Sequence, residues 1–440
     1  MYKTDIFKWQ EEIQTFDFDY DYDYFVNKTE IPNFSTTRFM DMFKKCKNSK
    51  QKIYALNHLT YMYQSLSYQL AYNKYQPHKF TKFISSYPQP REIYAPAFID
   101  RILHHHLVDF MMPHVEKRLY HHAYANRTAK GTHKGVFASQ KMMKEVSCQG
   151  YYMQCDVSSY FTSIDKNIAH KIVNFHIDKI NIPDNQKQFL SNTFKNIIFT
   201  NPELNHIKTG SFELEKLIRD KKKLGYNGKD IGLPIGSLSS QFISLLYLNE
   251  LDYYIKNKLK IKNYIRYVDD FVIFDKNSKN FKSQRDDINS FLQEELKLTL
   301  NPKKTKIQQF YKGLDFLGYV IYPTHINIRK RNIKMLKAKL KYANLWLEGK
   351  RTQARKIKMP DTTDLWKLSP TNYNEFQVFK FYILQLLNSY YGNFSIVNTY
   401  NLRRNIYENN MNLLKEFLVP VNSFTKFIIK PEPTLLRRCA

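Results

Sequence analysis

The sequence is poor in the residues that cross-link small secreted proteins or bind zinc. It contains only 4 cysteines among 440 residues, and no two of them form a CxxC pair. A disulfide framework and a zinc ribbon are therefore both disfavoured. No repeat of fixed period is visible either, which argues against a solenoid of stacked repeats.

Long apolar runs are also missing. No stretch reaches the roughly 18 to 20 apolar residues that a membrane-spanning helix needs, so no membrane partner is expected. The opening residues MYKTDIFKWQEE lack the basic stretch followed by an apolar stretch that marks a secretory signal. Both absences favour a protein of a reducing compartment, the cytoplasm.

Acidic residues are few relative to basic ones. The chain has 40 Asp and Glu against 68 Lys and Arg, which gives a formal net charge of +28. Such an excess favours a polyanionic partner, nucleic acid first and an anionic membrane surface second. Hydrophobic residues reach 43%, which is enough for a packed core and excludes disorder of the whole chain.

Strand and helix patterns interleave in the middle of the chain, and helix patterns dominate after residue 327. An apolar strand is expected over 151–157, and two short strands around a tight turn over 264–274. The polar, lysine-rich stretch 201–230 is expected to be an insertion or a long connection. Aromatic residues and aspartates alternate over 16–25, which favours an edge strand or an acidic arm. This order predicts an α+β body followed by a helical domain.

The sharpest local feature is the run YIRYVDDFVIF, in which Asp269 and Asp270 interrupt apolar and aromatic residues. The flanking residues favour a hairpin with the two aspartates at its tip. Adjacent carboxylates repel each other, and a divalent cation reverses that cost. Since Mg²⁺ prefers oxygen ligands, the pair is a candidate metal site, with an ordinary polar turn as the alternative.

A second predicted strand also ends at a carboxylate, because Asp156 follows the hydrophobic run in YYMQCDVSSYFTSID. Two strands can bring Asp156 beside Asp269 and Asp270. Three carboxylates at strand ends would hold two metal ions about 3.5–4 Å apart, the arrangement that serves in-line phosphoryl or nucleotidyl transfer. Between them, GLPIGSLSSQ places glycines before a predicted helix, which suits a phosphate loop or an ordinary turn.

Taken in order, these segments resemble a reverse transcriptase. The resemblance rests on the FxxI block after Asp156, the GLPIGSLSSQ loop, YVDD, LNPKKTKI and FLGY. Upstream, REIYAPAFIDRILHHHL followed by YANRTAKGTHKGV resembles the fingers segments of bacterial reverse transcriptases, closest to those of diversity-generating retroelements and of defence enzymes related to abortive infection. The resemblance implies a right-hand polymerase with fingers, a palm with an antiparallel sheet, and a helical thumb.

The same resemblance divides the chain into four parts. Residues 1–75 would be an N-terminal extension, and residues 76–150 the fingers. Residues 151–325 would be the palm, with the insertion 200–230 and part of the fingers. Residues 326–440 would be the helical thumb and a C-terminal tail.

The resemblance also implies a metal site and a nucleotide site. Two Mg²⁺ ions, with Mn²⁺ as an alternative, would be held by Asp156, Asp269, Asp270 and the Val157 carbonyl. Arg91 would clamp the triphosphate of the incoming dNTP, and Phe161 would be the bulky residue that disfavours a 2′-hydroxyl. Ile235 and Gly236 would form the PxG loop beside the nucleotide. Lys304 would be the lysine near the pyrophosphate. Lys303 and Lys306 compete for the last assignment.

Further basic residues are candidates for contact with the triphosphate or the template. These are Arg127 and Lys130, for which a solvated basic loop is the alternative. Ile235 departs from many reverse transcriptases, which have Gln there. An aliphatic side chain makes no hydrogen bond, so looser nucleotide selection is expected, as in the diversity-generating and defence groups.

The primer is expected at the aspartate hairpin and at a second hairpin. Tyr267 and Val268 would lie at the primer end, and the gripping hairpin would be formed by Phe316, Leu317, Gly318 and Tyr319. Over residues 327–358, apolar residues recur at helical spacing and Lys and Arg fill the other faces. This pattern fits a thumb helix that tracks phosphates, with a solvated cationic helix as the alternative.

The resemblance predicts a cytoplasmic bacterial enzyme that makes cDNA from an associated non-coding RNA in antiphage defence. Its partners would be that RNA, the DNA product and dNTPs, with an accessory protein or a second copy of the chain left open. A diversity-generating retroelement enzyme and a template-independent, protein-primed enzyme of the abortive-infection type are the alternatives.

Overall fold

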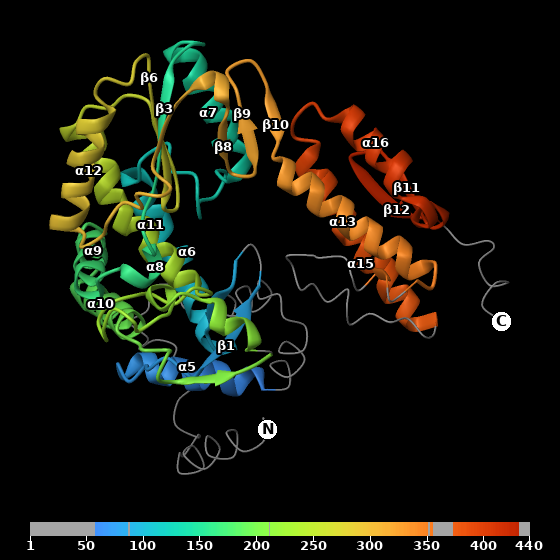
Figure 1. Cartoon of the computed structure of the whole chain (residues 1–440). Helices are drawn as coiled ribbons and strands as arrows, with labels where there is room; N and C mark the ends of the chain where they lie inside the picture. Colours follow the sequence, from blue (N-terminus) through green and yellow to red (C-terminus); the bar gives the residue numbers. More distant parts are fainter. Residues whose placement is uncertain (1–57, 87–88, 211, 351–352, 355–372, 431–440) are drawn as a thin grey trace.

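The computed structural model describes residues 58–430 apart from 87–88, 211, 351–352 and 355–372 (Figure 1). The alternation expected over 16–25 and most of the proposed N-terminal extension lie outside these residues. Helices and sheets are mixed, so the expected α+β class is confirmed. None of the helices in the described part is long and apolar enough to cross a membrane.

The centre of the molecule is a four-stranded sheet, called here the main sheet, with strand order β5-β6-β3-β7. Its strands are β3 (Tyr151–Asp156), β5 (Tyr264–Tyr267), β6 (Asp270–Asp275) and β7 (Lys306–Gln309), and every neighbouring pair is antiparallel. β5 and β6 form the hairpin that the YVDD run predicts.

Alternation along the strands gives each face of the main sheet its own core. On β6, Phe271 and Ile273 belong to one hydrophobic cluster, and Val272 and Phe274 belong to the other. Successive side chains of a strand point to opposite faces, so a strand covered on both sides reads as a continuous apolar run. This explains why FVIF shows no polar alternation.

Helices cover one face, and a mixed layer covers the other. The first core takes residues from α6 (Phe98–Val115), α9 (Lys166–Asp178), α10 (Asp184–Ile198), α11 (Leu238–Tyr253) and α12 (Phe281–Glu295). The second takes them from α7 (Thr132–Val146), β8 (Leu314–Phe316), β9 (Tyr319–Ile321), β10 (Ile326–Ile328), α13 (Lys330–Leu347), α15 (Tyr373–Phe394) and α16 (Tyr400–Asn410). In Figure 1 the last three helices stand together to one side of the main sheet.

The C-terminal third is less helical than its sequence predicts. After α16, β11 (Leu418–Val421) and β12 (Lys426–Ile429) form an antiparallel hairpin. The buried Phe427 of this hairpin packs edge-on against Tyr391 of α15, with ring centroids 4.7 Å apart. The expectation of helix failed here because a short β-branched run such as KFII is ambiguous by periodicity alone.

The stretch 201–230 carries regular structure and packs on a second sheet of order β2-β1-β4. β1 (Phe80–Ser85) pairs antiparallel with β2 (Arg91–Ala95) and parallel with β4 (His206–Lys208). The short helices η2 (Glu213–Leu217) and η3 (Asp220–Lys222) follow. The buried Lys82 of β1 binds Glu92 and Glu215 at 2.7 Å each, which ties this stretch to the sheet.

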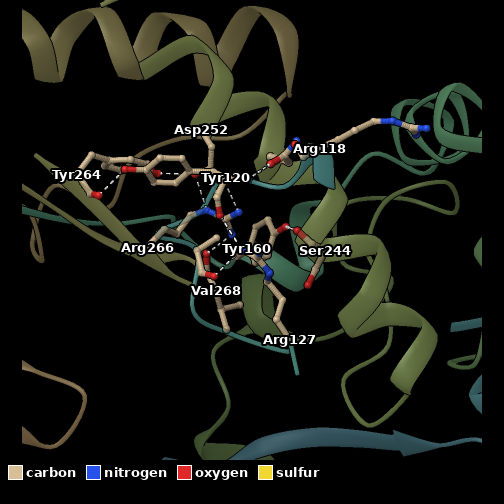
Figure 2. A network of polar contacts seen from close by, with 11 residues as sticks. Arg118, Tyr120, Arg127, Tyr160, Ser244, Asp252, Tyr264, Arg266 and Val268 are labelled. Carbon is tan, nitrogen blue, oxygen red and sulfur yellow. Dashed lines mark hydrogen bonds and ion pairs between the residues drawn. The ribbon is translucent and has the colours of Figure 1, made fainter. Parts of the chain in front are cut away.

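A buried ion pair holds the β5–β6 hairpin to α11 (Figure 2). The side chains of Arg266 and Asp252 are 1% and 0% exposed, and Asp252 accepts hydrogen bonds from Arg266 Nε and Tyr264 Oη at 2.7 Å each. Arg266 Nη1 donates to the carbonyl oxygen of Val268 at 3.0 Å, inside the hairpin turn. Tyr120 Oη donates to the Tyr264 carbonyl at 2.7 Å and so extends the network to the segment before α7.

We expect Asp252→Ala to lower the free energy of unfolding by about 3–5 kcal/mol, because it leaves the Arg266 guanidinium buried without its counter-charge. Guanidinium chloride denaturation measures the loss. The control is Asp286→Ala, which removes the exposed partner of Arg285 and is expected to change stability by about 0–1 kcal/mol. Equal effects of the two substitutions would contradict a structural role for the buried pair.

Candidate active site

The three predicted carboxylates meet at one end of the main sheet. Asp156, the last residue of β3, lies directly opposite Asp270, the first residue of β6, in the strand register. Asp269 precedes Asp270 in the β5–β6 turn, and its carbonyl accepts a hydrogen bond from Val157 N at 3.3 Å. Residues far apart in the sequence, called here the acidic triad (Asp156, Asp269, Asp270), are therefore adjacent in space.

The turn that carries the triad is held in an unfavourable backbone conformation. Val268 has φ of +56°, a left-handed value that a β-branched residue adopts rarely. The Arg266 guanidinium bonds the Val268 carbonyl. Strain of this kind persists only where the surroundings over-determine it, and here the buried ion pair supplies that constraint.

The carboxylates of the triad are difficult to ionise together. Burial, followed by the negative charge of Asp156, raises the pKa of Asp269 to about 6. Burial, followed by the charges of Asp269 and Asp156 and a hydrogen bond with Asp156, raises the pKa of Asp270 to about 7. An oxygen-ligated cation would relieve the repulsion.

Cationic and polar groups already surround Asp156, which is 4% exposed. Lys304 Nζ binds its Oδ1 at 2.7 Å, and Asn301 Nδ2 donates to its Oδ2 at 3.1 Å. Asn301 N also donates to the Asp156 carbonyl at 2.7 Å. Of the three lysines that compete in the sequence, Lys304 is the one bonded to the triad; Asn301 carried no sequence signal beyond its place in the LNPKKTKI segment.

The triad fits a divalent cation in donor chemistry, because carboxylate oxygens are the ligands that Mg²⁺ prefers. Within the described ranges, no three His, Cys, Asp or Glu side chains stand ready as a metal cluster. Both Asp156 oxygens are engaged by Lys304 and Asn301. The Lys304 ammonium thus lies beside Asp156 where a metal would compete with it, and Val157 lies next to this position, 1% exposed.

The PxG loop joins Phe161 to strand β2 through backbone contacts. Leu233 N donates to the Phe161 carbonyl at 2.7 Å, and Tyr94 N donates to the Ile235 carbonyl at 2.8 Å. Gly236 has φ of +120°, and a Cβ there would lie 2.8 Å from Ile93 Cγ2. Only glycine allows this approach, which explains the residue that follows Ile235.

Arg91, the first residue of β2, is exposed. Its positive charge lowers the pKa of Asp269, together with the charge of Lys304, against the larger effect of burial. The predicted arginine clamp and the triad are therefore within electrostatic reach of each other.

Arg127 does not lie where the sequence analysis expected it. Its side chain is 3% exposed, and all its donor nitrogens are used, by Glu116 and by the Tyr120 and Ala123 carbonyls. The correction has a physical cause: Glu116 comes from the end of the preceding helical segment, and a desolvated guanidinium needs such a partner. Lys130 likewise bonds within its own loop, to the His121 carbonyl at 2.8 Å.

Three of the predicted primer residues, Tyr267, Leu317 and Tyr319, lie against the start of α7. Tyr267 Oη lies 3.2 Å from Thr132 Oγ1. Phe316 to Tyr319 form the β8–β9 hairpin, whose turn residues Leu317 and Gly318 have φ of +53° and +91°. Tyr319 Oη donates to the Asn393 carbonyl of α15 at 2.9 Å, so this hairpin also contacts the C-terminal helical group.

One basic segment near the triad was missed. The lysines of the 201–230 stretch look alike in the sequence, but the charge of Lys222 interacts with Asp156, Arg91 and Lys304. A run of lysines predicts a solvated face, and nothing in it indicates which member interacts with a carboxylate distant in the sequence.

Comparison with known proteins agrees with this geometry. The family model described as "Reverse transcriptase (RNA-dependent DNA polymerase)" matches residues 87–321, which is more than half of the chain. Protein YkfC of Escherichia coli (strain K12) is 25% identical over 276 residues, which cover 55% of this chain and 64% of that protein.

A telomerase from Candida albicans, solved in complex with a TWJ fragment of telomeric RNA, is also similar. Its TM-score is 0.41 at 11% identity, over 78% of this chain and 59% of that one. The chain thus spans less than two thirds of either relative's length. From the match over residues 87–321, the chain belongs to the reverse transcriptase family and has the right-hand polymerase fold that the sequence predicts.

Proposed function

We propose that the protein is an RNA-directed DNA polymerase that extends a primer by two-metal nucleotidyl transfer. The observation that supports this most is the meeting of Asp156, Asp269 and Asp270 at the end of the main sheet. Burial, followed by their mutual repulsion, raises the pKa values of Asp269 and Asp270, and a bound divalent cation would offset both effects.

Bound Mg²⁺ or Mn²⁺ would activate the primer 3′-hydroxyl and offset charge on the leaving pyrophosphate. The carboxylates of the triad and the Val157 carbonyl would hold the ions. Lys304 would then leave Asp156 and donate a proton to the pyrophosphate. Arg91 would clamp the triphosphate bidentately.

The neighbouring residues would select and orient the substrates. Phe161 would lie under the sugar and disfavour a 2′-hydroxyl, while Ile235 and Gly236 would border the nucleotide. Tyr267, Val268 and the Phe316–Tyr319 hairpin would hold the primer. In this assignment the fingers include the β2-β1-β4 sheet, the palm is the main sheet, and the thumb begins at α13.

For the biological role, we extend the proposal to a bacterial enzyme that makes cDNA from its own structured non-coding RNA in antiphage defence. The resemblance of the fingers segments and the excess of basic residues support it. Sequencing of the nucleic acid that copurifies with the protein tests it. A template repeat that pairs with a variable-protein gene would favour the diversity-generating alternative, and DNA covalently attached to the protein would favour protein priming.

The double substitution Asp269→Ala plus Asp270→Ala is expected to reduce dNTP incorporation at least about 1,000-fold, because it removes two of the three metal ligands. Primer extension on an RNA template measures this. Binding of the RNA, measured by filter retention, should stay within about twofold, since the lysines and arginines remain. Asp275→Asn, at the other end of β6, is the matched control, and unchanged synthesis in the double variant would exclude the triad from the mechanism.

Mg²⁺ should stabilise the protein more at pH 8 than at pH 5.5. The pKa values are raised from 3.8 to about 6 for Asp269 and about 7 for Asp270. Ionisation of these carboxylates therefore lowers the stability of the metal-free protein as the pH rises from about 4 to about 7. Below about pH 6 protons compete with the ion for the same oxygens. At 100 times its dissociation constant the ion would add about 2.7 kcal/mol. Thermal melting with and without Mg²⁺ measures the difference, which Asp269→Asn plus Asp270→Asn should abolish; an equal shift at both pH values would contradict the site.

The exposed lysines of α13 should carry part of the RNA affinity. Lys334 and Lys341 are exposed and seven positions apart, so they share a helix face, while Leu336 and Leu340 are buried. Lys334→Gln plus Lys341→Gln is expected to reduce the slope of log affinity against log salt concentration by about 2. The control Lys276→Gln plus Lys279→Gln changes the loop after β6; the same reduction in the control would indicate a non-specific charge effect.

A further inference from the structure

The segment 219–224, called here the lysine arm, is fixed in place by contacts on both sides. Thr162 Oγ1 donates to the Lys221 carbonyl at 3.1 Å. Leu224 N donates to Glu92 Oε2 at 3.0 Å. Further along, Asn227 Nδ2 donates to the Thr162 carbonyl at 2.9 Å. The arm is therefore held against the protein by hydrogen bonds and is not a freely solvated connection.

The residues that anchor the arm are chain neighbours of the proposed nucleotide-binding residues. Thr162 follows Phe161, and Glu92 follows Arg91. Glu92 is itself bound to the buried Lys82, which also binds Glu215 just before the arm. The arm is thus tied to the two elements that carry Phe161 and Arg91.

Within the arm, Lys222 extends toward the segment that carries Arg91. Its Nζ donates to Gln89 Oε1 at 3.4 Å, near the start of β2. Partial burial lowers the pKa of Lys222, followed by the positive charges of Lys304, Arg91 and Arg219, while Asp156 acts in the opposite direction. The adjacent Lys223 turns back to Asp220, at 2.7 Å.

Charges from separate parts of the chain therefore act on the triad: Lys304 touches Asp156, the charge of Arg91 acts on Asp269, and the charge of Lys222 interacts with that of Asp156. Arg91 comes from β2, Lys222 from the lysine arm, and Lys304 from the segment before β7. Positive charges placed together repel one another, and divalent ions at the triad would add to that repulsion. Once divalent ions are bound at the triad, the positive charge would exceed the negative, and a polyanion beside these cations would compensate that excess.

We propose that Lys222 contacts the β- and γ-phosphates of the incoming dNTP, and then the released pyrophosphate, as a third cation beside Arg91 and Lys304. The inference rests on the proposed function and deepens it. Lys222 comes from the 201–230 stretch and not from a segment on which the family resemblance rests. A template phosphate is the competing anion, and the test separates the two.

The test is steady-state primer extension by the full chain with Lys222→Gln. Loss of one charge-assisted contact should raise the KM for dNTP about tenfold or more, and the inhibition constant of pyrophosphate should rise in parallel. Lys222→Arg should recover most of the loss. Lys223→Gln, the matched control, should behave as the unsubstituted protein, and unliganded melting temperatures should agree among all variants.

Three outcomes would overturn the inference. The first is an unchanged KM for dNTP in Lys222→Gln. The second is a raised KM for the template with an unchanged KM for dNTP, which would assign the lysine to nucleic acid. The third is an equal effect of Lys223→Gln, which would reduce the effect to general surface charge.

A second measurement does not depend on DNA synthesis. Inorganic pyrophosphate with Mg²⁺ should raise the melting temperature of the unsubstituted protein, and clearly less that of Lys222→Gln. A shift that is the same in both proteins would overturn the inference. The shift could depend on Lys222 while the unsubstituted protein fails to incorporate dNTPs on an RNA template. That result would support the anion site and contradict the proposed polymerase function.

Discussion

The repulsion among three carboxylates at the end of the main sheet is the constraint on which the rest of the structure depends. Asp156 and Asp270 face each other in the strand register, and Asp269 shares the turn. Such a group is unfavourable in a folded protein unless rigid surroundings hold it and positive charge compensates it. The chain meets these two needs with different sets of residues.

Buried residues make the β5–β6 turn rigid, and an exposed lysine compensates the negative charge of the triad. The Arg266–Asp252 pair is buried and carries no net charge, so it fixes the backbone without adding net charge near the triad. It holds the left-handed Val268. Lys304, by contrast, is largely exposed and touches Asp156, so it can move when another cation arrives. The backbone of the hairpin turn is thus held by buried residues, whereas the cation beside Asp156 is on an exposed side chain.

The sequence predicted those parts of the site whose position follows from a short stretch of neighbouring residues. Aspartates that end or interrupt apolar runs place carboxylates at strand ends, as found for Asp156 and Asp270. Arg127 was misjudged because its role depends on Glu116 and on carbonyls that only the folded loop brings together. The β11–β12 hairpin was missed because tertiary packing against Tyr391 decided between strand and helix.

The lysine arm shows why electrostatic sites are harder to predict than metal ligands. A carboxylate that binds a metal needs a defined backbone position, and strand patterns reveal such positions. A cation acts over a longer range, so any of several lysines in 201–230 can serve, and the choice is made by anchors such as Thr162 and Glu92. Those anchors also join the arm to the segments of Phe161 and Arg91, so displacement of one element must displace the others. A loop with no recognisable motif is thereby tied to the segments that are proposed to bind the nucleotide.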